Sequence, residues 1–101
     1  MFAVIYSFEV KNGCDNTFIE GWEGMTKLIY KHCDSLGSRL HNESESKYIA
    51  YAYWPSEEHW ENSANELPKE ADSYRAQMRE SCTKIETLHK LTTVSDILAK
   101  L

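Results

Sequence analysis

The sequence lacks the features that would place a protein in a membrane or on nucleic acid. No apolar run approaches the roughly 20 residues that a membrane-spanning helix needs, so we predict no membrane association. The N-terminus, MFAVIYSFEV, has neither a basic segment nor a small-residue cleavage site, so we predict no signal peptide. Basic clusters are absent and the formal net charge is −5. Because nucleic-acid binding depends on Lys and Arg that neutralise phosphates, we predict no nucleic-acid partner.

Cysteine, glycine and histidine motifs are also missing. The chain has 3 cysteines and no C-x-x-C, which argues against a disulfide framework or a zinc knuckle and favours a reducing cytoplasm. No phosphate-binding glycine loop is present, so we predict no nucleotide cofactor, and no H-x-x-x-H or H-E-x-x-H spacing indicates a metal. With 4 Gly, 2 Pro and no low-complexity tract or linker, residues 1–101 are predicted to form one domain.

The most informative stretch is KYIAYAYWPSEEHW, at residues 47–60. Side chains alternate along its first half, as in a β-strand. One face carries Ile49, Tyr51 and Tyr53, and the other carries Tyr48, Ala50, Ala52 and Trp54. Neither face is polar, so we expect both to be covered, and the two alanines leave room for a helix or a ligand. Pro55 ends the strand, and Ser56 caps a helix with Trp60, Ala64 and Leu67 on its inner side.

The whole chain reads as β-α-β-β-α-β. The predicted elements are strands at 2–10, 37–42, 48–54 and 84–94, helices at 15–33, 56–67 and 68–82, and helical turns at 95–101 that dock through Ile97, Leu98 and Leu101. This order predicts an α+β, ferredoxin-like fold: a four-stranded antiparallel sheet with helices on one face. The other face is largely apolar or aromatic, so we predict a homodimer in which two sheets pack face to face.

With this order in hand, the chain resembles the antibiotic biosynthesis monooxygenase (ABM) family of dimeric α+β barrels. The resemblance spans residues 2–94 and rests on FAVIYSFEVKNG, LGSRLH, YIAYAYWPSEEHWE and IETLHKL. It implies an enzyme that oxidises a small aromatic or quinol with molecular oxygen, without flavin or metal. Some relatives only bind small ligands. A non-catalytic ligand-binding or stress-associated dimer is therefore the alternative, and whether the chain is an enzyme stays open.

The resemblance also implies site residues. Trp60 is the first, because the family places an aromatic residue near the start of this helix. Tyr74, Arg75 and Arg79 follow as candidates on the next helix, and Ser7 takes a position where some relatives carry Asn. The haem-degrading branch uses an Asn, a Trp and a His, and two of these three differ here. Haem degradation is therefore not expected.

Each of these residues also has a purely structural interpretation. The Trp60 and Tyr74 side chains could be core, and Arg75 and Arg79 could pair with nearby acidic residues on a solvated helix face. Further candidate ligand contacts come from the strands, and they are Tyr51, Trp54 and His89. His89 is a candidate because imidazole titrates near neutral pH.

Overall fold

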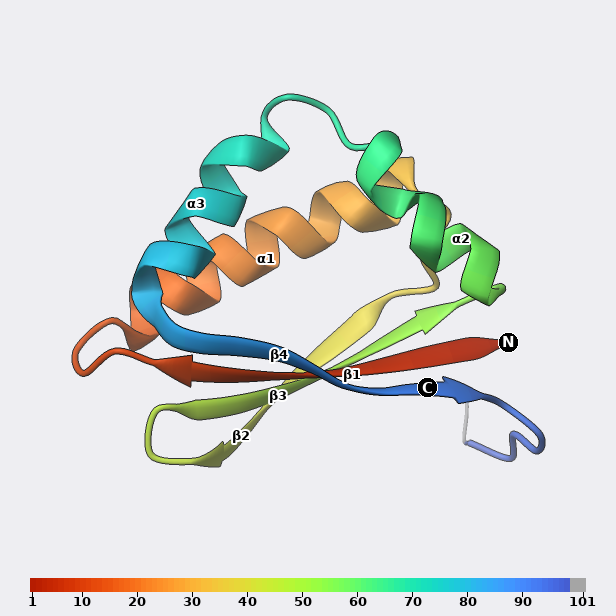
Figure 1. Ribbon diagram of the computed structural model, residues 1–101, viewed down its shortest axis with the longest axis horizontal. Coiled ribbons are helices and arrows are strands. Elements are labelled where there is room, and N and C mark those ends of the chain that lie inside the picture. The colour runs from red at the N-terminus through yellow and green to blue at the C-terminus, as the bar shows by residue number, and fades with distance from the viewer. Residues whose placement is uncertain (99–101) are drawn as a thin grey trace.

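The computed structural model describes residues 1–98 and consists of one sheet with its helices on one side (Figure 1). The elements are β1 (Phe2–Val10), α1 (Asp15–His32), β2 (Ser38–Ser44), β3 (Lys47–Trp54), α2 (Glu57–Asn62), a 3₁₀ turn (Ser63–Asn65), α3 (Ala71–Ser81) and β4 (Cys82–Thr92). The strands lie in the order β2-β3-β1-β4, and all neighbours are antiparallel. The predicted ferredoxin-like fold is confirmed. No helix within residues 1–98 is long and apolar enough to cross a membrane.

The core lies between the sheet and the helices. The predicted alternation of β3 is confirmed, because Tyr48, Ala50, Ala52 and Trp54 are all buried on the helix side. Alternate residues of β1 lie on the same side, and they are Phe2, Val4, Tyr6, Phe8 and Val10. Phe18 of α1 is fully buried and contacts two rings of the sheet: its ring centroid lies 5.0 Å from that of Phe8 and 5.2 Å from that of Tyr48.

A bulge in β4 changes the faces that strict alternation predicts. Ile5 pairs with His89, but the next residue of β1, Tyr6, pairs with Thr87, so Leu88 is an extra residue. An extra residue in one strand shifts every later side chain to the opposite face. Ile85 therefore lies on the helix side, whereas His89 lies on the open face. Strict alternation along residues 84–94 would have placed these two side chains on the same face.

The helix that carries Trp60 is shorter than predicted. Ser56 does cap it, since its hydroxyl accepts from the His59 backbone N–H at 3.3 Å. The helix ends at Asn62 because the Ser63 hydroxyl donates to the Trp60 carbonyl at 2.7 Å, and the Ser63 N–H bonds the same carbonyl. This carbonyl would accept the Ala64 N–H in a continuing α-helix. Ala64 is exposed instead of packing inward.

The predicted C-terminal helical turns are also absent from the described part, residues 95–98. The Asp96 carboxylate instead accepts the Tyr53 hydroxyl at 3.2 Å and the Leu98 backbone N–H at 3.0 Å. The bond from Tyr53 ties the segment to the open face of the sheet, and the bond from Leu98 is a local turn between residues two apart. Ile97 and Leu98 are 96% and 70% exposed, so neither docks onto this chain. Leu101, the third predicted docking residue, lies outside the described residues.

Candidate functional site

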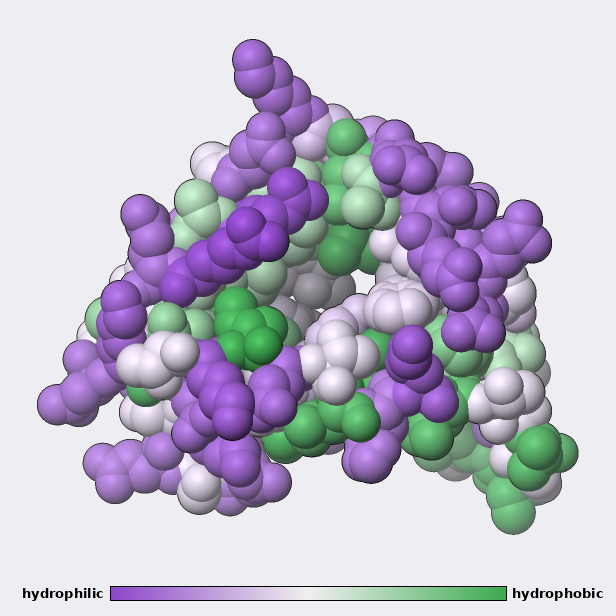
Figure 2. Space-filling view, in the orientation of Figure 1, coloured by the Kyte–Doolittle hydropathy of each residue, from purple (hydrophilic) through white to green (hydrophobic). Residues whose placement is uncertain are grey.

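A cavity of about 390 Å³ lies between the helix side of the sheet and helices α1 and α3. This volume is near the lower end of the roughly 300–1,000 Å³ that small-molecule sites span. In the space-filling view a hollow opens between α3, β4 and α2 (Figure 2). The wall is made of Tyr6, Phe8, Trp22, Met25, Thr26, Ile29, Ser38, Ala50, Ala52, Trp54, Arg75, Met78, Arg79 and Ile85. Ala50 and Ala52 are small enough to leave this space above β3, as their position predicted.

A hydrogen bond between β1 and α2 fixes one side of the site. The Trp60 indole Nε1–H donates to the Tyr6 hydroxyl at 2.8 Å. The Trp60 ring also lies 6.0 Å from that of Phe2, and the Lys90 ammonium sits 5.6 Å from its centroid, within cation–π range. Burial raises the pKa of Tyr6, outweighing the opposite effect of the bond from Trp60. Tyr6 is therefore a neutral phenol at physiological pH.

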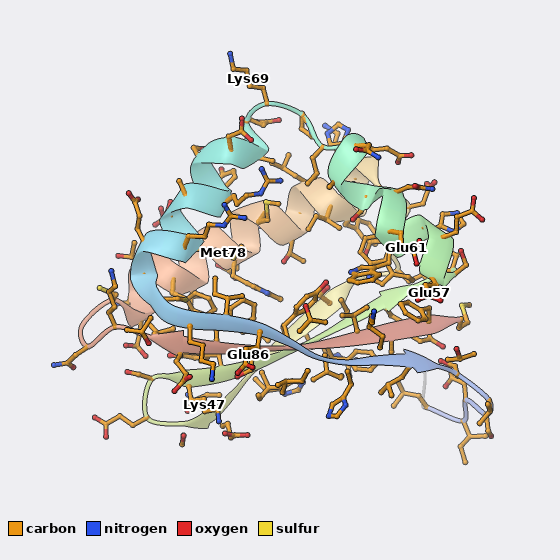
Figure 3. All side chains as sticks on the ribbon, viewed as in Figure 1. Lys47, Glu57, Glu61, Lys69, Met78 and Glu86 are labelled. Atoms are coloured by element: carbon orange, nitrogen blue, oxygen red, sulfur yellow. The ribbon has the colours of Figure 1, made fainter. Side chains whose placement is uncertain are left out.

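Helix α3 brings positive charge to the cavity. Arg75 and Arg79 lie four residues apart, one turn of the helix, so both side chains reach the same side. Met78 extends from α3 into the space above the sheet (Figure 3). The Arg75 guanidinium donates to the exposed Asp72 carboxylate at 3.1 Å, which confirms one of the ion pairs considered from the sequence. Arg79 forms no ion pair with any residue in 1–98. The ion pair between Arg75 and Asp72 is weak because it lies at the surface. Both arginines therefore stay available to an anion.

Trp54 contributes a buried donor to the wall. Its side chain is 3% exposed, and its indole Nε1–H has no hydrogen-bond acceptor among the described residues. Buried donors without partners are uncommon because each costs about 1–3 kcal/mol. Protein atoms cover this N–H, so the Trp54 ring contributes apolar surface to the wall while its donor stays buried.

The structure divides the candidate residues into two groups. Three of them line the cavity, and these are Trp54, Arg75 and Arg79. Trp60 does not line the cavity itself, but it donates a hydrogen bond to Tyr6, which does. Tyr74 packs elsewhere: its ring lies against Gly24, where α3 crosses α1. That contact favours the structural interpretation of Tyr74.

The other three candidates lie on the opposite side of the sheet. Ser7 sits between Tyr6 and Phe8, which both point toward the helices, so its own side chain points to the open face. Tyr51 and His89 occupy the same open face, which Figure 3 shows with Lys47 and Glu86 on it. A ligand in the cavity cannot contact these side chains.

Tyr6 is the wall residue that the sequence interpretation missed. The signal was present, because strand alternation already placed Tyr6 on the helix side with Phe8, and its hydroxyl is the only polar side chain on that face of β1. The family resemblance drew attention to the neighbouring Ser7 instead. Within residues 1–98, no group of three or more His, Cys, Asp or Glu side chains is arranged to hold a metal ion.

The fold is that of the antibiotic biosynthesis monooxygenases. The chain is similar in structure to SnoaB, a cofactor-independent oxygenase from Streptomyces nogalater, with a TM-score of 0.77 and 12% identity over 95% of each chain. A putative antibiotic biosynthesis monooxygenase from Nitrosomonas europaea gives a TM-score of 0.77 at 8% identity, covering 94% of this chain and all of that one. Rv0793 from Mycobacterium tuberculosis gives 0.75 at 14% identity, over 96% and 98% of the two chains.

Sequence comparisons add no closer relative. No model of a known protein family matches the chain, and no curated protein matches it significantly. At 8–17% identity the structural likeness establishes the fold and leaves the activity to be argued from the cavity.

Proposed function

We propose that the protein is a cofactor-independent monooxygenase that oxidises a small aromatic or quinol-type substrate with molecular oxygen. The observation that carries this proposal is the cavity itself: an apolar slot of about 390 Å³ with aromatic walls and two guanidinium groups at its side. An aromatic ring fits such walls, and positive charge stabilises the anion of an acidic phenol. The structural likeness to SnoaB supports the same chemistry.

The chemistry would proceed through the substrate's own anion. A phenol or anthrone loses a proton, and the electron-rich anion reduces oxygen directly. For an anthrone, one oxygen atom becomes the new ring carbonyl and the other leaves as water, so the CH₂ carbon and O₂ are balanced. The protein holds the anion beside Arg75 and Arg79, and the apolar wall keeps water from the reacting carbon.

One observation favours the alternative, a small-ligand-binding module without turnover. Among the described residues, the cavity wall contains no Asp, Glu or His. A general base for the phenolic proton is usually one of these side chains. The oxygenase therefore needs a substrate acidic enough to ionise beside the arginines, whereas a binding module needs no base at all.

Oxygen uptake decides between the two. We would measure uptake by metal-free protein with a panel of quinols and hydroxylated anthrones, beside Arg79→Met, which removes one guanidinium from the wall. Uptake well above the autoxidation of the substrate, and reduced at least tenfold in the variant, is the expected result. Uptake equal to autoxidation across the panel would reject the oxygenase and favour the binding module.

We also infer a homodimer formed through the open face of the sheet, in a reducing compartment such as the cytoplasm. The open face carries large side chains with no helix over them, including Ile5, Ile49, Tyr51 and Leu91. Uncovered apolar surface of this kind marks an interface. All three cysteines are free, which suits a reducing compartment. Three titratable thiols after denaturation of protein purified without reductant would support that location, and fewer would oppose it.

A further inference from the structure

The polar groups of the cavity wall are mostly hydrogen-bond donors. Arg75 and Arg79 only donate. The wall hydroxyls of Thr26 and Ser38 can donate or accept, and no carboxylate or imidazole lines the wall within residues 1–98. A ligand that presents acceptor oxygens finds partners on several sides. A ligand that presents only N–H or ammonium donors finds almost none and meets two positive charges.

Tyr6 belongs to these donors because of Trp60. An indole N–H can only donate, so the 2.8 Å bond fixes the Tyr6 oxygen as its acceptor. The hydroxyl proton of Tyr6 must then point away from Trp60. No described residue accepts this proton, and Tyr6 lines the cavity. The cavity is therefore where its acceptor would bind.

We propose that the cavity binds an aromatic oxyanion, a phenolate or a carboxylate, and that Tyr6 donates its hydroxyl proton to the anionic oxygen. Trp60 is a positioning residue that aims this proton and does not contact the ligand oxygen itself. The proposal rests on the proposed function insofar as both use the same cavity, and it names the ionised state in which the substrate binds. It also assigns a ligand-contacting role to a residue that the family resemblance did not indicate.

The charge of the wall supports a ligand that binds already ionised. The wall has two guanidinium groups, one of which has no ion-pair partner among the described residues, so these groups neutralise the charge of an anion that enters. The raised pKa of Tyr6 is consistent with this role, because a phenol that stays protonated remains a donor.

Three probes of one ring size test the selection by charge on the unmodified protein. Calorimetric titration under nitrogen with 2-naphthoate, 2-naphthamide and 2-naphthylmethylammonium measures binding without oxidation. We expect naphthoate to bind at least tenfold more tightly than the neutral amide, and the ammonium not to bind. Equal affinity for the three probes, tighter binding of the ammonium, or no saturable binding of naphthoate would each overturn the proposal.

Variants test the role of Tyr6. Tyr6→Phe removes only the hydroxyl and should weaken naphthoate binding by roughly ten- to a hundredfold, the usual effect of a hydrogen bond to a charged acceptor. Tyr30→Phe is the matched control, because Tyr30 is 62% exposed on α1 and lies outside the cavity wall. Naphthoate binding by Tyr6→Phe at the strength of Tyr30→Phe would rule out donation by Tyr6. The three-probe comparison above does not depend on any variant folding.

A double-mutant cycle tests the role of Trp60. Trp60→Phe should weaken naphthoate binding when Tyr6 is present, because the hydroxyl proton is no longer aimed. In the Tyr6→Phe background the same change should have almost no further effect. If Trp60 acted only as packing, its replacement would weaken binding equally in both backgrounds, and the positioning role would be rejected.

These results are independent of turnover. Tyr6-dependent naphthoate binding with no oxygen uptake on any quinol would reject the oxygenase and leave the oxyanion site standing. Oxygen uptake by a protein that does not bind naphthoate more tightly than the other probes would support the oxygenase and reject the oxyanion site.

Discussion

At the scale of single residues, hydroxyl groups of the sheet connect it to the start of helix α1. Tyr48 is 8% exposed, and its hydroxyl donates to the Asp15 carboxylate at 2.6 Å. Asp15 also accepts the Ser46 hydroxyl at 3.2 Å and is the first residue of α1, where negative charge is favourable. One carboxylate thus holds the β2–β3 hairpin against the start of α1.

Removing the Tyr48 hydroxyl should therefore weaken the fold. We expect Tyr48→Phe to lower the free energy of unfolding by about 1–2 kcal/mol, because a short bond to a carboxylate is lost. Urea denaturation followed by circular dichroism measures the change. Tyr30→Phe, an exposed tyrosine on α1, should stay within about 0.5 kcal/mol of the wild type. Equal stability of the two variants would show that the Asp15 bond contributes nothing.

A second residue-scale prediction concerns alkaline pH. Burial raises the pKa of the Cys82 thiol to about 11 from 9.0. Above pH 9 the unfolded chain therefore loses this proton while the folded chain keeps it, so the free energy of unfolding falls as pH rises from about 9 to 11. The slope for one such group approaches about 1.4 kcal/mol per pH unit.

Denaturation in reductant at pH 8, 9 and 10 tests this slope. We expect Cys82→Ala to show a flatter decline than the wild type. Burial raises the pKa of Tyr6 and Tyr51 as well, so part of the decline should remain in the variant. Identical slopes for the two proteins would show that the Cys82 thiol does not titrate differently on folding.

At the scale of elements, α3 approaches α1 closely over two glycines. A Cβ added at Gly21 would lie 3.2 Å from the Met78 backbone nitrogen, and one at Gly24 would lie 2.3 Å from the Tyr74 ring. The two obstacles differ in kind. The helix backbone at Met78 cannot move without displacing Arg75 and Arg79 from the cavity, whereas the Tyr74 ring can rotate outward.

Alanine at these two positions should therefore have different effects. Gly21→Ala should lower the free energy of unfolding by about 1–2 kcal/mol, since overpacking exceeds the gain of about 1 kcal/mol in helix propensity. Gly24→Ala should destabilise the wild type but stabilise a Tyr74→Ala background, where the propensity gain remains and the clash is gone. Chemical denaturation of the four proteins measures this coupling. Additive effects would contradict the close contact between Gly24 and Tyr74.

At the scale of the whole molecule, the open face of the sheet has no helix of residues 1–98 over it (Figure 1). The Tyr51 and Tyr53 rings stack there at 5.9 Å. The segment after β4 lies beside them, with Val94 and Ile97 almost fully exposed. Both the sheet face and this segment present apolar area that a second copy of the chain would cover.

A charge on this face should disrupt the inferred dimer. We expect the wild type to sediment at twice the 11.7 kDa of one chain and Tyr51→Glu to sediment as a monomer at the same concentration. A buried unpaired carboxylate is costly at an interface, so Tyr51→Glu should weaken the association of the two copies. Tyr30→Glu on α1 is the control and should remain dimeric. Wild-type protein that sediments at 11.7 kDa would reject the dimer.

Local rules were sufficient for the sequence to determine the strands, the capped helix start at Ser56 and the order of elements. Strand alternation and capping depend on neighbouring residues alone, so Tyr48 to Trp54 could be assigned to their faces without a structure. The ferredoxin-like fold then followed from the order, whereas the two arginines on α3 became site candidates only through the family resemblance.

Only the tertiary structure decided which side chains share the cavity. The bulge at Leu88 and the position of Asp96 arise from pairing and hydrogen bonds between distant parts of the chain, whereas the early end of α2 rests on a local bond between Ser63 and Trp60. Alternation already placed Tyr6 and Ser7 on opposite faces of β1, but the bond from Trp60 to Tyr6 spans 54 residues, so no local pattern could have predicted that Trp60 occupies the Tyr6 oxygen. A binding site depends on such distant contacts, whereas a strand depends on its own alternation.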